Sequence, residues 1–226
     1  MSSPWAAASG RAAKASRLPY AFAWLLVASC ACAQPAPKDF RQAAWGMTAS
    51  QVRAAESQAP ASVADKDGAA LLRYDAVTFQ GLMAQVVYIL TRDRLVRAKY
   101  VFSADHDDAN DFIGDFKAIE PLLTKQFGKP AESRAIWEDD STQLEPKSYL
   151  DQDRASPANI LASDPLVGLA VSLGHLRLYT LWIGPRTRIL HALSGENHRI
   201  THQIEYRSVQ LAPPEDAARP PAKAAQ

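Results

Sequence analysis

Cysteine is scarce in this sequence, and its absence from most of the chain excludes one class of fold. The 226 residues contain two cysteines, Cys30 and Cys32, both near the N-terminus. A disulfide framework of the kind that staples small secreted domains is therefore excluded for the rest of the chain. About 175 residues remain once the two ends are set aside, which is enough to fold on a hydrophobic core.

Acidic residues are missing from the first 38 positions. Arg11, Lys14 and Arg17 are the only charges before Lys38. An apolar run follows them over residues 18–27, and it is shorter than the roughly 20 residues that a helix needs to cross a bilayer. This length argues against a retained membrane anchor.

A basic start, a short apolar core and then small residues is the order found in a secretory signal peptide. We expect residues 1–33 to be that signal and residues 34–39 to be a linker. The mature protein is then expected in the periplasm of a bacterial cell envelope.

Two processing sites fit the end of the signal, and the sequence leaves both open. Ala31-Cys32-Ala33 before Gln34 matches ordinary signal peptidase, which would release a soluble secreted protein. Val27-Ala28-Ser29-Cys30 resembles a lipobox, which would make Cys30 the lipidated first residue of an outer-membrane lipoprotein. Membrane contact is expected only in the second case, through the lipid anchor.

A strong excess of charge is also lacking. The chain has 25 basic and 24 acidic residues. Loss of the three basic residues of the signal leaves 22 against 24, a net charge of −2. A near-neutral domain with interspersed charges offers no general electrostatic attraction for nucleic acid.

Helical signals occur at three places. Thr48 and Gln51 form a capping box, which predicts a helix over residues 49–57. A second helix is indicated by apolar residues at helical spacing, with a kink or restart at Pro121 and an end at Gly128: Phe112, Phe116, Ile119, Leu123 and Phe127. Asp164-Pro165 predicts the start of a third helix that ends at Gly174.

Strand signals form two groups of three. The first group covers residues 71–79, 82–90 and 95–102, with a hairpin turn at Gln80-Gly81. The second covers residues 176–183, 187–193 and 199–209, with a hairpin loop at residues 194–197. A short additional strand is expected at residues 135–137.

These elements predict an α+β fold, in which an antiparallel sheet of two three-stranded meanders packs against two or three helices. We expect a single domain over residues 40–210, with two similar halves at 40–130 and 131–210. Its core should contain Tyr100, Phe116, Leu123, Trp182, Ile200 and Ile204. Residues 211–226 are rich in proline and alanine, and we expect them to be disordered.

Two short stretches resemble known proteins. Gly46-Met47-Thr48 with Gln51-Val52, and Leu123 with Phe127-Gly128 and Pro130, resemble segments of the small lipoprotein of the outer-membrane β-barrel assembly machinery. The helix-into-meander build is similar to that of β-lactamase-inhibitor-protein-like modules. The chain as a whole resembles a family of exported bacterial proteins of uncharacterised function that share a Trp-Gly-Met helix start. The resemblance implies a binding or scaffolding module and no functional residue.

Catalytic signatures are lacking. The chain has no Gly-x-Ser-x-Gly elbow and no Ser-x-x-Lys motif, so the sequence does not predict an enzyme. No cofactor is expected. Paired carboxylates at Asp139, Asp140, Asp151 and Asp153 fall in a polar stretch, where solvation explains them.

Three histidines are candidate metal ligands. His198 and His202 share strand parity, and His191 lies on the neighbouring strand, so three imidazoles on one sheet face could bind zinc or copper. The interleaved Ile200 and Ile204 instead favour a core role for that face. An acidic cluster at residues 105–111 could suggest calcium, but carboxylates at a helix start account for it.

The sequence therefore favours a non-catalytic protein of the cell envelope that binds another protein. Its partner would contact the exposed sheet face or the long polar loop at residues 138–162, which carries Trp137 and Tyr149 near its ends. The alternative is a carrier or sensor of a small ligand in the periplasm. Trp137 and Trp182 could stack on such a ligand, although aromatic residues in strands usually lie in the core.

Overall fold

The computed structural model describes residues 37–66, 68–139, 141–142 and 156–212. They belong to one unit of the chain, Ala36–Gln226. The expected signal peptide with Cys30 and Cys32 lies outside the described residues, as do Tyr149 and residues 213–226 of the expected tail. Within the described part, no helix is both long and apolar enough to span a membrane.

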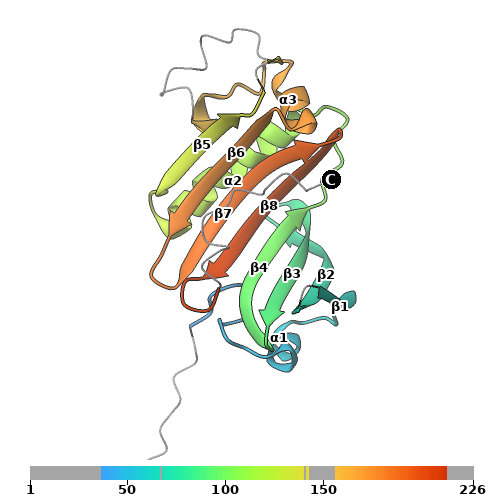
Figure 1. Cartoon of the computed structure of the whole chain (residues 1–226), viewed down its shortest axis with the longest axis vertical. Coiled ribbons are helices and arrows are strands. Elements are labelled where there is room, and N and C mark those ends of the chain that lie inside the picture. Colours follow the sequence, from blue (N-terminus) through green and yellow to red (C-terminus); the bar gives the residue numbers. More distant parts are fainter. Residues whose placement is uncertain (1–36, 67, 140, 143–155, 213–226) are drawn as a thin grey trace, which may run out of the picture. The chain divides into compact units, whose positions relative to one another are not determined.

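An antiparallel sheet dominates the structure (Figure 1). Its strands follow the order β1-β2-β3-β4-β8-β7-β6-β5. Their bounds are β1 Ser62–Lys66, β2 Ala69–Phe79, β3 Leu82–Thr91, β4 Arg94–Phe102, β5 Glu132–Trp137, β6 Leu176–Ile183, β7 Thr187–Glu196 and β8 Arg199–Ser208. The α+β class predicted from the sequence is confirmed.

The strand count differs from the prediction, because each meander has four strands. β1 was missed, since its residues are mostly exposed and give no alternating apolar pattern. β5 begins at Glu132, three residues before the expected start. The two meanders meet where β4 pairs with β8, with Tyr100 opposite Ile204, so the two expected halves share one continuous sheet.

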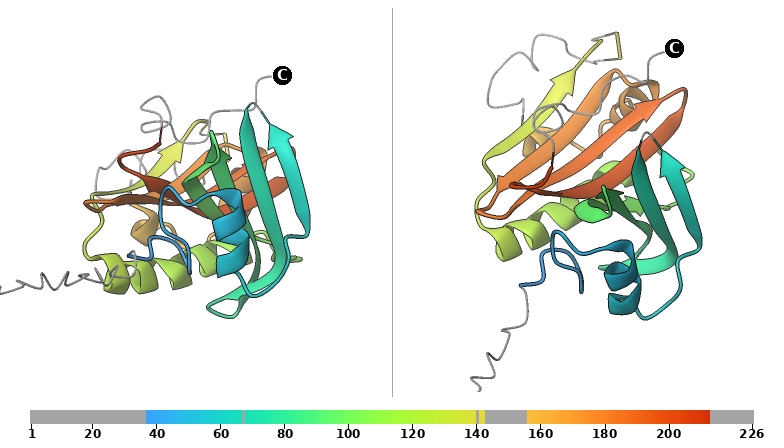
Figure 2. Two further views of the ribbon diagram at one scale, coloured as in Figure 1. Left: turned by 90° about the horizontal axis from the view of Figure 1, so that it is seen from below. Right: turned by 60° about the horizontal axis from the view of Figure 1, so that its bottom comes forward.

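Three α-helices lie against one face of this sheet: α1 Ala49–Ala55, α2 Asp111–Phe127 and α3 Val167–Leu173. Figure 2 shows α2 running beneath the strands, and its contacts are with β7, β8 and α3. The capping box at the start of α1 is confirmed, because Thr48 Oγ1 accepts from Gln51 N and Gln51 Oε1 accepts from Thr48 N.

The expected restart at Pro121 is wrong, because α2 is a single helix that contains Pro121. The third helix begins at Val167, later than predicted. Asp164 caps a turn instead, where its Oδ1 accepts from Leu166 N at 3.0 Å. The ends predicted for the second and third helices are confirmed, since Gly128 and Gly174 are the C-caps of α2 and α3. The first helix, α1, ends at Ala55, two residues before its predicted end.

Close backbone packing holds α3 on the second meander. A Cβ atom at Gly195 would overlap the carbonyl oxygen of Val171, and one at Gly168 would overlap the backbone of Ala109. The close approach at Gly168 also allows a hydrogen bond, in which Asn110 Oδ1 accepts from Gly168 N at 2.6 Å. Glycine at position 195 thus lets α3 approach β7, and glycine at position 168 lets α3 approach the segment that precedes α2.

The β7–β8 turn differs from the expected four-residue loop. β7 continues to Glu196, and the turn consists of Asn197 and His198, both with positive φ. Two left-handed residues suit a tight hairpin turn. His191 consequently pairs with Ile204 rather than lying opposite Ile200. The tight turn predicted at Gln80-Gly81 is confirmed by positive φ at both residues.

The core consists of two apolar clusters. One gathers around Tyr74, Tyr88 and Trp182, and the other around Phe116, Val171 and Leu193. Of the six predicted core residues, Tyr100, Phe116, Leu123, Trp182 and Ile204 are buried. The prediction for Ile200 is wrong in degree, because this side chain lies next to the hairpin turn and is only partly buried.

The domain extends slightly beyond both predicted boundaries. Asp39, expected in the linker, accepts a bidentate pair from Arg186 at 2.8 Å and a hydrogen bond from Trp45 N at 2.9 Å. Leu211 and Ala212, expected in the tail, continue the turn after β8 and donate their amides to Ser208.

The last part of the expected loop at residues 138–162 is structured. Residues Pro157–Asn159 form a short 3₁₀ helix, η3, and Ile160 is 1% exposed. Lys117 of α2 donates to the carbonyls of Ala158 and Ile160. Residues 156–160 therefore belong to the packed domain, while residues 143–155 lie outside the described residues.

Candidate binding face

The face of the sheet opposite the helices is the candidate site, and we call it the open face. Side chains alternate along each strand, so residues 97, 99 and 101 of β4 and residues 201, 203, 205 and 207 of β8 point away from α1, α2 and α3. In Figure 1 this face is turned toward the viewer, and α2 passes behind β6 and β7.

A row of three arginines crosses the middle of the open face. Arg97 of β4 pairs with Arg207 of β8, and Arg207 pairs with Arg188 of β7. Neighbouring strands lie only about 4.8 Å apart, so the three guanidinium groups start from adjacent positions. Like charges directly opposite one another destabilise a sheet. We call Arg97, Arg207 and Arg188 the arginine row.

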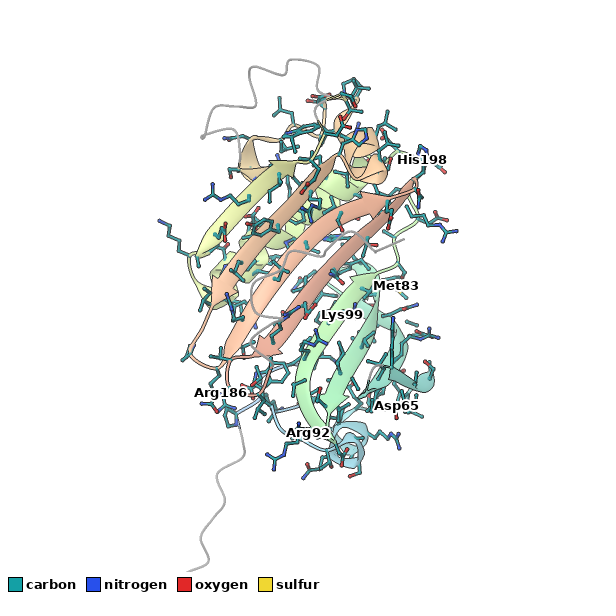
Figure 3. The ribbon with its side chains drawn as sticks, in the orientation of Figure 1. Asp65, Met83, Arg92, Lys99, Arg186 and His198 are labelled. Atoms are coloured by element: carbon teal, nitrogen blue, oxygen red, sulfur yellow. The ribbon has the colours of Figure 1, made fainter. Side chains whose placement is uncertain are left out.

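Lys99 and Glu205 lie beside the arginine row as a cross-strand pair. Glu205 forms ion pairs with Arg207 and, at 4.0 Å, with Arg97. Arg188 forms no ion pair with the part of the chain that the structure describes. Among the described residues, four cationic side chains and the carboxylate of Glu205 thus lie together at this place. Figure 3 shows Lys99 on β4 between the two halves of the sheet.

Burial lowers the pKa of the Lys99 ammonium group. The negative charge of Glu205 opposes this shift, while Arg97, Arg207 and Lys66 lower the pKa further. Three cations act on Lys99 against one carboxylate, so the electrostatic potential here is positive even though the whole domain is near neutral.

Partly buried apolar side chains flank the charged residues on the open face. They are Val87, Val101, Tyr179, Leu181 and Leu190. Ile183, directly opposite Arg188, is 58% exposed. A shallow depression beside Tyr179, Ala192 and Ser194 measures about 10 Å³, which is room for one water molecule. The surface is suited to contact with another surface more than to enclosing a ligand at this depression.

Two of the three candidate histidines meet in the core. His191 and His202 lie on neighbouring strands, and their Nε2 atoms are 2.8 Å apart. Both are buried, at 0% and 1% exposure, and Phe116 stacks on the His191 ring with centroids 4.0 Å apart. One Nε2 must donate and the other accept, so the two rings cannot both be protonated, and their burial disfavours even one charge. Burial lowers the pKa of His202 to about 3 and that of His191 well below 6.5.

His198 does not join this pair, because it lies in the exposed β7–β8 turn. Figure 3 shows His198 and Arg186 at opposite ends of β7. Within the described ranges, no group of three histidine, cysteine or acidic residues could hold a metal ion. His191 and His202 alone could serve as metal ligands, yet each already uses its Nε2 on the other ring.

The remaining sequence candidates fall into structural positions. Trp182 is 2% exposed and donates its indole N–H to the Gly128 carbonyl at 3.0 Å, so it belongs to the core. Trp137 ends β5 and is partly buried. Asp108 accepts from Asn110 N, and Asp111 opens α2. Asp139 is exposed, and the other paired carboxylates, Asp140, Asp151 and Asp153, lie outside the described residues.

No local pattern in the sequence indicates the arginine row. Its members are separated by up to 110 positions in the chain. The pairing of β7 with β8 brings Arg188 to Arg207, and the pairing of β4 with β8 adds Arg97. The alternation of Arg97 and Lys99 with apolar residues did predict that both lie on the wet side of β4.

Comparisons with known proteins gave no match to the chain. No protein-family model matches it. No curated protein and no solved structure matches it either.

Proposed function

We propose that this protein is a non-catalytic binding module of the cell envelope, and that it binds another protein through the open face of its sheet. The observation that supports this most is the make-up of that face. Arginines and half-buried apolar side chains lie next to one another there, while the described helices all pack on the opposite side.

Protein interfaces are rich in arginine, tyrosine and apolar side chains with a polar rim. The open face offers the same mixture around Arg188, Ile183 and Tyr179. The location of the protein in the cell envelope is also part of the proposal. It rests on the order of charged and apolar residues in positions 1–33. The export route leaves both the soluble and the Cys30-lipidated forms open.

Site-specific photocrosslinking tests this function. A crosslinking amino acid replaces Thr201, an exposed open-face residue of β8, in cells that express the full chain. The matched control carries it at Lys125, an exposed residue of α2. The proposal expects a discrete adduct from position 201 and none from position 125. Adducts from position 125 alone, or from neither position, would refute it.

A further inference from the structure

The arginine row places like charges side by side on three neighbouring strands, and Glu205 forms ion pairs with only two of its members among the described residues. Each of its two cross-strand pairs places like charges opposite one another, which disfavours strand pairing. Strands β4, β8 and β7 could carry threonine or glutamate at these positions and pair at least as well. Residues that oppose the pairing preferences of their strands in this way occur mainly at functional sites.

We propose that the arginine row and Lys99 form the docking site for an acidic, extended segment of a partner protein. This inference rests on the protein-binding function proposed above. It adds the chemistry of the partner, which presents aspartate or glutamate side chains to Arg97, Lys99, Arg188 and Arg207.

Charge complementarity is the first argument for an acidic occupant. Among the described residues, Glu205 forms ion pairs with Arg97 and Arg207, and Arg188 forms none. Nη1 of Arg207 is buried and has no hydrogen-bond partner within the described residues. A guanidinium group has five N–H donors, and bidentate bonding to a carboxylate is its preferred pairing. Because that nitrogen is buried, a partner's carboxylate would bind first at Arg188, which is only partly buried and forms no ion pair with the described residues.

Spacing is the second argument. Arg97 and Lys99 are two residues apart on the same strand, so they start about 6.7 Å from one another on one face. Carboxylates at every second position of an extended peptide have the same repeat. Ile183 at the end of the row adds an exposed apolar contact next to Arg188. A phosphate-rich polymer would make no use of this apolar neighbour.

Nucleic acid and lipid fit the face less well than protein does. The mature chain has a net charge of −2, so long-range attraction to a polyanion is weak. The positive potential is instead confined to three adjacent strands between apolar side chains. Such a local arrangement selects a short acidic segment rather than a charged surface.

Fluorescence anisotropy with two synthetic peptides tests the inference. The probe has glutamate at every second position with threonine between, and its control has glutamine in place of glutamate. The protein is purified from cells that express the full chain. We expect the glutamate peptide to bind and the glutamine peptide not to bind, with an affinity that falls as salt rises.

The variant R188E/R207E should bind the glutamate peptide at least about tenfold more weakly. It should gain binding to a peptide with lysine at the same positions. R188Q removes one positive charge without adding a negative one, so it tests the inference even if the double variant does not fold. It should also weaken binding of the glutamate peptide. R53E, a matched arginine on the exposed side of α1, should bind as the wild type does.

Several results would overturn the inference. Equal binding of both peptides to the wild type, or wild-type affinity in both R188Q and R188E/R207E, would do so. So would tighter binding to phosphatidylglycerol vesicles than to the peptide, or a homodimer that R188E/R207E dissociates. If the Thr201 crosslink persists in R188E/R207E cells, the binding function stands and only the acidic partner is wrong. If the wild type gives no crosslink, the function itself fails.

Discussion

Arg188 and Arg207 lie directly opposite one another on the neighbouring strands β7 and β8, and Arg97 extends the same row on β4. Like charges in this position oppose strand pairing. An acidic partner would remove the repulsion by supplying carboxylates. The free domain should therefore have a lower free energy of unfolding than a variant without the like-charge pair. Binding of an acidic partner should remove this loss of stability.

Replacement of Arg188 by threonine should stabilise the free domain by about 0.5 kcal/mol, because it removes one like-charge pair and adds a strong strand former. Urea denaturation at low salt measures the change. The control is R134T, since Arg134 is also on the open face but pairs with Glu132 at 3.3 Å. A loss of more than about 1 kcal/mol in R188T would show that Arg188 serves the fold.

Replacement of Gly195 by alanine should destabilise the domain by about 3 kcal/mol or prevent folding. The new Cβ would overlap the Val171 carbonyl and push α3 off the sheet. Gly114 is the matched control, because a Cβ there meets nothing within 4 Å and alanine favours the helix by about 0.5–1 kcal/mol. Thermal melts of G195A and G114A should shift in opposite directions. A G195A melt equal to that of the wild type would contradict the packing described.

The neutral pair His191 and His202 should make the domain sensitive to acid. Both folded-state pKa values lie below 6.5, that of His202 at about 3. The unfolded chain thus binds more protons than the folded chain between about pH 6.5 and pH 3. The stability is complete above about pH 6.5 and falls below it, by up to about 1.4 kcal/mol per pH unit for each histidine.

The control for this effect is H191L/H202L, which keeps the volume and removes both titrating groups. Unfolding free energies at pH 7 and pH 5 should differ less in this variant than in the wild type. An equal loss in both proteins would place the acid sensitivity elsewhere.

The ion pair between Arg41 and Glu56 should anchor the N-terminal segment to the sheet. Nε and Nη2 of Arg41 donate to the two carboxylate oxygens of Glu56 at 3.0 Å, and Tyr88 donates its hydroxyl to the same carboxylate. The Glu56 side chain is 3% exposed. E56Q leaves the guanidinium without its charge partner, so we expect a loss of about 3 kcal/mol.

A double-mutant cycle with R41M separates the pair from its surroundings. The structure predicts a coupling energy above about 1 kcal/mol, because the two groups share two hydrogen bonds. Strict additivity of E56Q and R41M would mean that the pair does not act as a unit.

Local signals in the sequence were sufficient for much of the fold. The capping box at Thr48, the turn at Gln80-Gly81 and the glycine stop at Gly174 each depend on a few neighbouring residues, and each is confirmed. β1 was missed because its stability comes from pairing with β2 rather than from its own pattern.

The open face depends on strand register, which the sequence does not encode locally. A shift of the β7–β8 turn by a few residues changes which side chains are opposite one another. The expected loop at residues 194–197 placed His191 against Ile200 and hid the pairing of Arg188 with Arg207. The pairing of β4 with β8 is even harder to predict from local patterns, because about 100 residues separate the two strands.

Mapping the binding site by NMR tests the central claim most directly. The isotopically labelled protein is titrated with the glutamate peptide, and backbone amide shifts are followed. The account predicts the largest changes on β4, β7 and β8, at Arg97, Lys99, Arg188, Glu205 and Arg207, with little change in α1 and α2. Shifts centred on the helices, or no shifts at low salt, would contradict it.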